Sequence, residues 1–329
     1  MVQVRIESKR FLDFLQITDM EYVDVFIAPD TMVMINNSEE IFGMMQFQAK
    51  VDAGDVGRTF RLVRSVMQKL YTPGIITFEF AEQNVAIGIC GKAPQPIWRF
   101  SIKQQDPLSF TYKDKVDLCK ELNEYNSVEL TEILPIVRYM KPFKSMITIE
   151  NGLVTGFVNS RVRICKKISI KDAFTINSVV LSKVISLNTK VIRARTFLAA
   201  RNENLTVLAT LCTPMHFTDF DYLEEQGSAL KCNIYFGNIA ELFKKIDFKT
   251  ENVELDLMAK TLKLEKDRVT YTIPILLKDL EVAKGYAPEK ISIEIGLFKN
   301  LLTRIGNQFN LSQKKSCIRL EASDTIIYL

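Results

Sequence analysis

The chain has very little histidine and no paired cysteines. His216 is the single histidine among 329 residues, and the six cysteines are scattered without a C-x-x-C pair. This composition lacks the ligand spacing of a structural zinc site and the framework of a small disulfide-bonded domain. We therefore expect reduced cysteines that serve packing, and neither a metal nor a cofactor.

Recognisable catalytic motifs are also missing. His216 has no serine or cysteine partner in a known motif, and GKAPQ (91–95) lacks the first glycine and the Ser/Thr of a phosphate-binding loop. The acids of DFDYLEE (219–225) are more typical of a solvated linker than of a cation site. The sequence thus predicts a protein that is not an enzyme.

Long apolar runs are absent as well. No segment approaches the roughly 18–20 apolar residues of a membrane-spanning helix, and the opening MVQVRIESKR has no hydrophobic signal segment. Apolar residues still make up 47% of the chain, which is enough for sizeable cores. We expect a cytoplasmic protein, in the nucleoid or in the cytoplasm of a host, without a membrane partner.

What the chain does contain is a recurring pattern of strands and short helices. Alternating apolar and polar residues predict strands at 2–8, 22–27, 75–80, 85–90, 253–258 and 291–296. Helical spacing occurs at 8–17, 57–71, 132–143, 178–190, 238–246 and 297–306. The expected N-caps are Ser8, Ser178 and Asn238, and Gly306 is expected to end the last helix.

The pattern repeats one unit, a strand, a short helix and about three strands. Six such units begin near residues 2, 47, 128, 173, 231 and 291, and two of them make a domain of normal size. The sequence therefore predicts an α+β fold of three similar domains. Their expected bounds are 1–110, 111–225 (with a linker at 111–126) and 226–329.

Each predicted helix carries a basic patch, although the net charge is only +4. Lys and Arg favour helices and complement the dipole in a last turn, but this does not explain Arg58 and Arg61 in the first turn of 57–71. A face of one sign without a pocket suits the phosphates of duplex DNA. The expected DNA-binding residues are Lys9, Arg10, Arg58, Arg61, Arg64, Lys69, Arg138, Lys141, Lys144, Lys183, Lys190, Lys244, Lys245, Lys299 and Arg304.

Two local strings strengthen this interpretation. VELTEILPIVRYMKPFKS (128–145) is similar to the entry into domain two of DNA sliding clamps, and PIWRFSIKQQDP (96–107) resembles the closing strand of their domain one. The resemblance to these polymerase processivity factors implies helices that line a central hole and sheets that form the outer wall. Three domains per chain imply the bacterial beta-clamp arrangement, a head-to-tail homodimer around double-stranded DNA.

The resemblance also implies partners. Clamps bind DNA polymerase and other proteins through a short apolar motif that enters a groove between domains two and three; whether a clamp loader is required stays open. The positions that match by location are Phe157, Val158, Arg161, Ile326, Ile327, Tyr328 and Leu329. The apolar tail TIIYL (325–329) could equally be a last strand buried in the domain-three core.

The sequence also departs from the bacterial pattern. The Thr-Asp-Gly/Thr-His-Arg signature is absent, and the nearest stretch is TGFVNSRVRI (155–164). The chain is shorter and its first linker longer, so we interpret it as a divergent member from a phage or mobile element. The alternative is a monomeric β-rich viral structural or scaffold protein with a basic surface.

Overall fold

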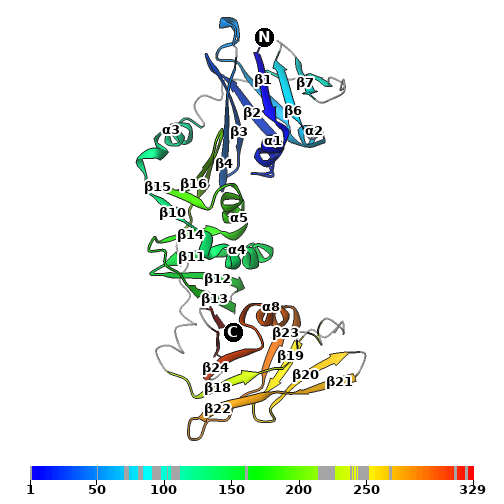
Figure 1. The fold of residues 1–329 in the computed structure, drawn as a ribbon, viewed down its shortest axis with the longest axis vertical. Coiled ribbons are helices and arrows are strands. Elements are labelled where there is room, and N and C mark those ends of the chain that lie inside the picture. Colours follow the sequence, from blue (N-terminus) through cyan, green and yellow to red (C-terminus); the bar gives the residue numbers. More distant parts are fainter. Residues whose placement is uncertain are drawn as a thin grey trace. The chain divides into compact units, whose positions relative to one another are not determined.

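The computed structural model describes most of the chain. The described residues are 2–49, 51–69, 74–80, 84–90, 98–101, 103–104, 112–159, 162–213, 227–237, 239, 241, 243, 252–266, 269–314, 317–322 and 325–329. Among them, no helix is both long enough and apolar enough to cross a membrane. They form mostly antiparallel sheets with a few short helices, which confirms the expected α+β class (Figure 1).

The chain divides into two compact units. The first consists of Met1–Pro142 and Ile176–Thr213, and the second of Phe143–Thr175 and Pro214–Leu329. Neither of these bounds tests the predicted division into three domains, which stays a prediction.

The first unit contains a four-stranded and a nine-stranded sheet. The order in the smaller one is β1 (Val2–Glu7), β6 (Ile75–Phe80), β7 (Asn84–Cys90) and β8 (Trp98–Ser101). The order in the larger one is β10 (Ser127–Glu129), β15 (Lys190–Ala194), β16 (Phe197–Asn202), β17 (Leu205–Thr210), β4 (Ile41–Gln48), β3 (Thr31–Asn37), β2 (Tyr22–Ile27), β5 (Thr59–Val63) and β9 (Lys103–Gln104).

The other two sheets repeat these two sizes. The nine-stranded one has the order β14 (Phe174–Asn177), β11 (Met146–Glu150), β12 (Leu153–Asn159), β13 (Val162–Lys167), β26 (Thr325–Tyr328), β25 (Cys317–Ala322), β24 (Gln308–Lys314), β18 (Leu230–Tyr235) and β22 (Leu276–Val282). The four-stranded one has the order β21 (Val269–Pro274), β20 (Thr261–Lys266), β19 (Asn252–Asp256) and β23 (Ile291–Glu294).

Most predicted helices are present. The α-helices are α1 (Ser8–Leu15), α2 (Arg64–Lys69), α3 (Lys113–Glu121), α4 (Leu134–Met140), α5 (Ser178–Leu187) and α8 (Ile295–Ile305). Short 3-10 segments lie at Ala53–Asp55, Leu122–Glu124, Thr131–Ile133 and Lys141–Phe143. Gly306 follows α8 with φ 75°, as expected, whereas the predicted helix at 238–246 lies largely outside the described residues.

Two expected N-caps are wrong. Glu7 occupies the N-cap position of α1, and the Ser8 hydroxyl instead accepts a hydrogen bond from the backbone N–H of Gly74 at 3.0 Å. Asn177, not Ser178, caps α5, because its side-chain oxygen accepts from the N–H of Val179 at 2.8 Å. In α1 and α5 the N-cap is therefore the residue before the serine that the sequence suggested.

The predicted helix at 57–71 is wrong over its first half. Residues 59–63 form β5, which pairs with β2 along its whole length, and among the described residues of this range only Arg64–Lys69 are helical. Tertiary pairing overrides the helical spacing here, because Thr59, Phe60 and Leu62 are buried in the sheet and their residue types also suit a strand.

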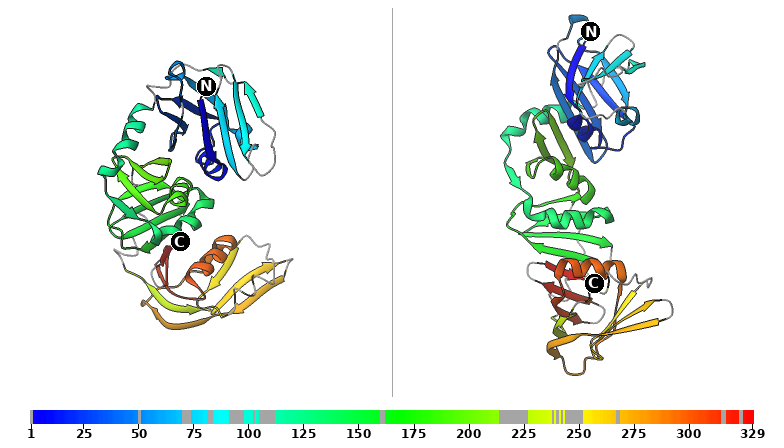
Figure 2. Two further views of the ribbon diagram at one scale, coloured as in Figure 1. Left: turned by 45° about the horizontal axis from the view of Figure 1, so that its top comes forward. Right: turned by 45° about the vertical axis from the view of Figure 1, so that its right-hand side comes forward.

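The predicted linker at 111–126 contains an unexpected helix. Helix α3 packs on the nine-stranded sheet of the first unit, on the opposite side from α1 and α5 (Figures 1 and 2). We call its contact the first cluster, whose buried members are Ile35, Phe42, Met44, Leu118, Cys119, Leu122, Ala194, Ala199 and Leu208.

The first cluster lies across what we call the first junction, where β4 pairs with β17. Residues 41–45 lie opposite residues 205–209 in antiparallel register. Strand β4 belongs to predicted domain one and β17 to predicted domain two, so one sheet continues across the expected boundary. On the α1 side, Gly43 allows Ile17 to pack closely, because a Cβ at Gly43 would lie 2.8 Å from Cδ1 of Ile17.

Candidate nucleic-acid interface

Three arginines of the predicted one-signed face have acidic partners inside the first unit. Nε of Arg61 donates to Oδ1 of Asp24 at 2.7 Å, and this hydrogen bond raises the pKa of Arg61. Arg58 pairs with Asp55 three residues earlier in the chain. We expected these two cations on a helix, but Arg61 lies in β5 and Arg58 directly before it. The charge of each is balanced by a neighbouring aspartate.

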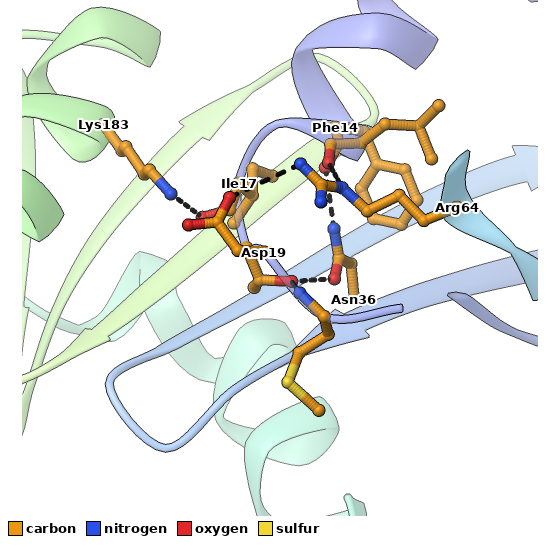
Figure 3. Close-up of polar contacts among 9 residues, drawn as sticks. Phe14, Ile17, Asp19, Asn36, Arg64 and Lys183 are labelled. Atoms are coloured by element: carbon orange, nitrogen blue, oxygen red, sulfur yellow. Dashed lines mark hydrogen bonds and ion pairs between the residues drawn. The ribbon is translucent and has the colours of Figure 1, made fainter. Parts of the chain in front are cut away.

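Arg64 and Lys183 meet at the C-terminal end of α1 (Figure 3). Nε of Arg64 donates to the carbonyl oxygen of Leu15 at 2.6 Å, and its Nη2 lies 3.4 Å from Oδ1 of Asp19. From α5, Nζ of Lys183 donates to the carbonyl oxygen of Ile17 at 2.9 Å. Arg64 thus binds a carbonyl that the end of α1 leaves without an intrahelical partner, and Lys183 binds a carbonyl two residues beyond that end.

A buried polar side chain also binds the turn that follows α1. Asn36, on β3, is fully buried; its Nδ2 donates to the carbonyl oxygen of Phe14 at 3.1 Å, and the Thr18 hydroxyl donates to its Oδ1 (Figure 3). Because these buried groups satisfy one another, the segment that follows α1 is held in one conformation.

Burial changes the titration of Lys183. Desolvation is the main cause that lowers its pKa, and the charges of Arg64 and Lys141 act in the same direction, while Asp19 opposes them. Lys183 therefore lies among charges of both signs, since Asp19 and Glu40 act against Arg64 and Lys141.

Other predicted cations are exposed. Lys9 on α1, Arg138 on α4, Lys141 just after α4, Lys144 and Lys190 all present exposed side chains. Lys190 lies in β15, so the expectation that it belongs to the fourth helix is wrong. Arg10 is half-buried and pairs with Glu7 and Glu203.

The remaining predicted cations lie on or near α2 and α8 or outside the described residues. Lys299 on α8 lies with Nζ 5.5 Å from the ring centre of Phe243. Lys69 and Arg304 lie in α2 and α8, but their side chains are not described, and Lys244 and Lys245 lie outside the described residues. Lys9, Lys141 and Lys183 line one cavity. DNA binding by the fifteen predicted residues stays a prediction.

A cavity of about 590 Å³ brings these three lysines together. It opens between α1, the end of α4 and α5, entirely within the first unit. The sequence shows Asp13 and Asp19 as acids among the basic helices, but it did not place Asp13 or Ser182 at this cavity, and it did not pair Asp19 or Asp24 with an arginine. Only the register of β2 against β5 brings Asp24 opposite Arg61, so no local signal would have found that pair.

The predicted partner-peptide residues gather partly in the second unit. The tail forms β26, which pairs with β13 on one side and β25 on the other. We call the β13–β26 pairing the second junction, and the second cluster on it consists of Phe157, Cys165, Ile326 and Tyr328. Arg163 lies over the Tyr328 ring, 5.4 Å from its centre.

Burial within this group is uneven. Ile327 is fully buried, whereas Leu329 is half-buried and exchanges backbone hydrogen bonds with Ile318. The side chain of Val158 and the whole of Arg161 lie outside the description. The tail is therefore a sheet strand, and its use as part of a groove stays a prediction.

Comparisons by sequence find no relatives. No family model matches the chain, and a search of curated proteins finds no match. Comparisons by structure do find similar proteins over the full length.

A putative DNA polymerase III beta subunit from Eubacterium rectale matches with a TM-score of 0.70 at 13% identity, over 100% of this chain and 98% of that one. The beta subunit from Thermotoga maritima matches with a TM-score of 0.68 at 11% identity, over 100% and 98%. The beta chain from Streptococcus pneumoniae matches with a TM-score of 0.66 at 13% identity, over 100% and 99%. The chain therefore has the fold of sliding clamps.

Proposed function

We propose that this protein is a DNA sliding clamp, a processivity factor that encircles duplex DNA and tethers a polymerase without catalysis. The observation that carries the proposal is the full-length structural likeness to DNA polymerase III beta subunits. Exposed lysines and arginines on and beside α1 and α4 supply the positive charge that such a role needs. The cytoplasm, whether of a bacterium or of a host to a phage or mobile element, is the proposed location.

The proposed mechanism needs only loose contacts. Lysines that neutralise phosphates release counterions and do not read the bases, so they attract any duplex equally. Exposed side chains such as Lys9, Arg138 and Lys141 can exchange one phosphate for the next as the protein slides. Topological closure, not affinity, then keeps the protein on DNA.

Closure by a second copy requires free sheet edges. Strand β8 is one edge of the sheet β1-β6-β7-β8, and β21 is one edge of the sheet β21-β20-β19-β23. Val269 and Thr270 on β21 are exposed, and no described strand pairs with the outer side of β21, so a partner strand could cover this edge. We propose that β21 of one copy pairs with β8 of the other in a head-to-tail homodimer.

The proposed site for polymerase and other clamp-binding-motif proteins is the second junction. Phe157, Ile326 and Tyr328 supply an apolar floor, and Leu329 remains accessible beside it. We expect Leu329→Asp to weaken the binding of a short apolar clamp-binding peptide at least tenfold, measured by fluorescence anisotropy. Unchanged affinity would place the peptide elsewhere.

Retention on DNA tests the function directly. The protein, loaded on nicked circular duplex with or without a loader ATPase, should stay bound through gel filtration in moderate salt and should leave once the circle is cut. Equal loss from circular and linear DNA would overturn the proposal.

Solution mass separates the proposal from the alternative of a monomeric structural or scaffold protein. Light scattering should give twice the 37.7 kDa of one chain. Val269→Asp on β21 should shift the mass toward that of one chain, whereas Met258→Asp should not, because the equally apolar and exposed Met258 lies in a turn. A single-chain mass for the unmodified protein would favour the alternative.

A further inference from the structure

Four cations lie at the cavity between α1 and α5 or at the nearby end of α1, and they differ in whether they already have a partner inside the protein. Nζ of Lys183 is bound to the carbonyl oxygen of Ile17, and Arg64 is bound to the carbonyl oxygen of Leu15 and paired with Asp19 (Figure 3). Lys9 and Lys141 line the same cavity with exposed side chains. Two cations are therefore engaged inside the protein and two face the solvent.

The engaged pair binds the chain at, and just after, the C-terminal end of α1. Helix α1 has no basic residue of its own in its last turn to complement the helix dipole. Arg64, the first residue of α2, reaches the carbonyl of Leu15 at the helix end, and Lys183, in the second turn of α5, reaches the carbonyl of Ile17 two residues further on. Removing either cation would leave a partly buried carbonyl without its donor and would loosen α1 from α5.

Lys9 and Lys141 lie where a bound anion would balance the positive charge of the lysines. Lys9, Lys141 and Lys183 all line this one cavity, so three positive charges share it. Among the described residues that line the cavity, Asp13 is the single acid, against the three lysines. A phosphate group in the cavity opening would balance this excess.

We infer that Lys9 and Lys141 together bind one backbone phosphate of DNA, and that Lys183 and Arg64 are positioning residues that fix α1 against α5 so that the two free lysines flank it. The assignment of the anion to DNA rests on the proposed function. The division of roles rests on the contacts around Leu15 and Ile17.

The test measures how the affinity for a short linear duplex depends on salt. Each phosphate contact contributes about 0.9 to the slope of log affinity against log salt. The double variant Lys9→Gln/Lys141→Gln should make the slope shallower by about 1 and leave the melting temperature unchanged. The matched control, Lys113→Gln/Lys120→Gln on α3 across the sheet, should change neither quantity.

Lys183→Met distinguishes positioning from direct contact. We expect a lower melting temperature, faster amide exchange at residues 15–18, and the same loss of slope as in the double variant. Combined with the double variant, it should remove no further slope, and Lys183→Arg should restore both slope and exchange.

Two results would overturn the inference. If Lys183→Met changed exchange but not the slope, its role would be structural only. If it added a further loss of slope to the double variant, Lys183 would itself bind phosphate. Both readouts use linear DNA, so a protein that fails to be retained on circles would refute the clamp proposal without deciding the roles of these lysines.

Discussion

The two junctions of the molecule are built alike but are covered differently. At the first junction, β4 pairs with β17; at the second, β13 pairs with β26. Helix α3 packs its apolar side onto the first cluster, which spans strands from both sides of the pairing. Among the described residues, the second cluster consists of strand residues only.

The difference shows how a helix packed on a sheet can strengthen the pairing of two strands within it. Backbone pairing alone joins two strands, whereas α3 also contacts β3, β4, β15, β16 and β17 through buried side chains. Arg201 on β16 adds hydrogen bonds to the carbonyl oxygen of Cys119 and to Asn123. We therefore expect the first junction to resist opening more than the second.

The largest effect should come from removing apolar volume beneath α3. Leu122 is fully buried, so Leu122→Ala should lower the free energy of unfolding by about 2–5 kcal/mol. Ile326→Ala in the smaller second cluster should cost about 2 kcal/mol, near the lower end of that range. Urea unfolding compares the two, and an equal or reversed order would contradict the idea that α3 makes the first junction the stronger one.

A smaller effect is expected from the arginine at each junction. Arg201→Met removes charge-assisted hydrogen bonds to α3 and should cost about 1.5–3 kcal/mol. Arg163→Met removes the contact with the Tyr328 ring, which contributes about 0.5–1 kcal/mol. Amide exchange in α3 should rise only in the first variant; a rise in both would mean that the junctions open together.

The buried thiols give a site-specific measure of how readily each junction opens. Cys119 lies in the first cluster and Cys165 in the second, whereas Cys212 is exposed. In native protein we expect a maleimide to label the exposed Cys212 faster than either junction thiol, and to label Cys119 more slowly than Cys165. Peptide mapping should show that Leu122→Ala accelerates labelling of Cys119 and not of Cys165.

The pH dependence of stability offers the smallest signal. Burial raises the pKa of the Cys119 thiol to about 12, from 9.0 for an ordinary thiol. Between these values the unfolded chain has lost the proton that the folded chain keeps, so stability falls as pH rises, by up to about 1.4 kcal/mol per pH unit. Cys119→Ala should remove this part of the slope, which a comparison of urea midpoints from pH 9 to 10.5 can measure.

Much of the fold could be predicted from local pattern. The alternating strands and the helices α1, α4, α5 and α8 are where the sequence places them, because each buries one apolar face. Helix α3 was missed although Val116, Cys119 and Leu122 recur at helical spacing, because the many charges of 111–126 favoured a linker. Strand β5 was missed because its pairing with β2 is not a local property.

The candidate interface was less predictable than the fold. The sequence shows which residues are positive, but not which are already neutralised. Arg61 pairs with Asp24, 37 residues earlier, and Lys183 binds a carbonyl 166 residues earlier. Such partners depend on how distant segments pack, so only the structure separates engaged cations from exposed ones.

The central place of β26 in its sheet has a consequence during synthesis. Strand β26 fills the gap between β13 and β25, so a nascent chain that ends before residue 325 leaves both of those strands with a bare edge. Bare edges invite pairing with other chains. The second nine-stranded sheet can therefore be completed only after residues 325–328 have left the ribosome, and products terminated before them should be prone to aggregate.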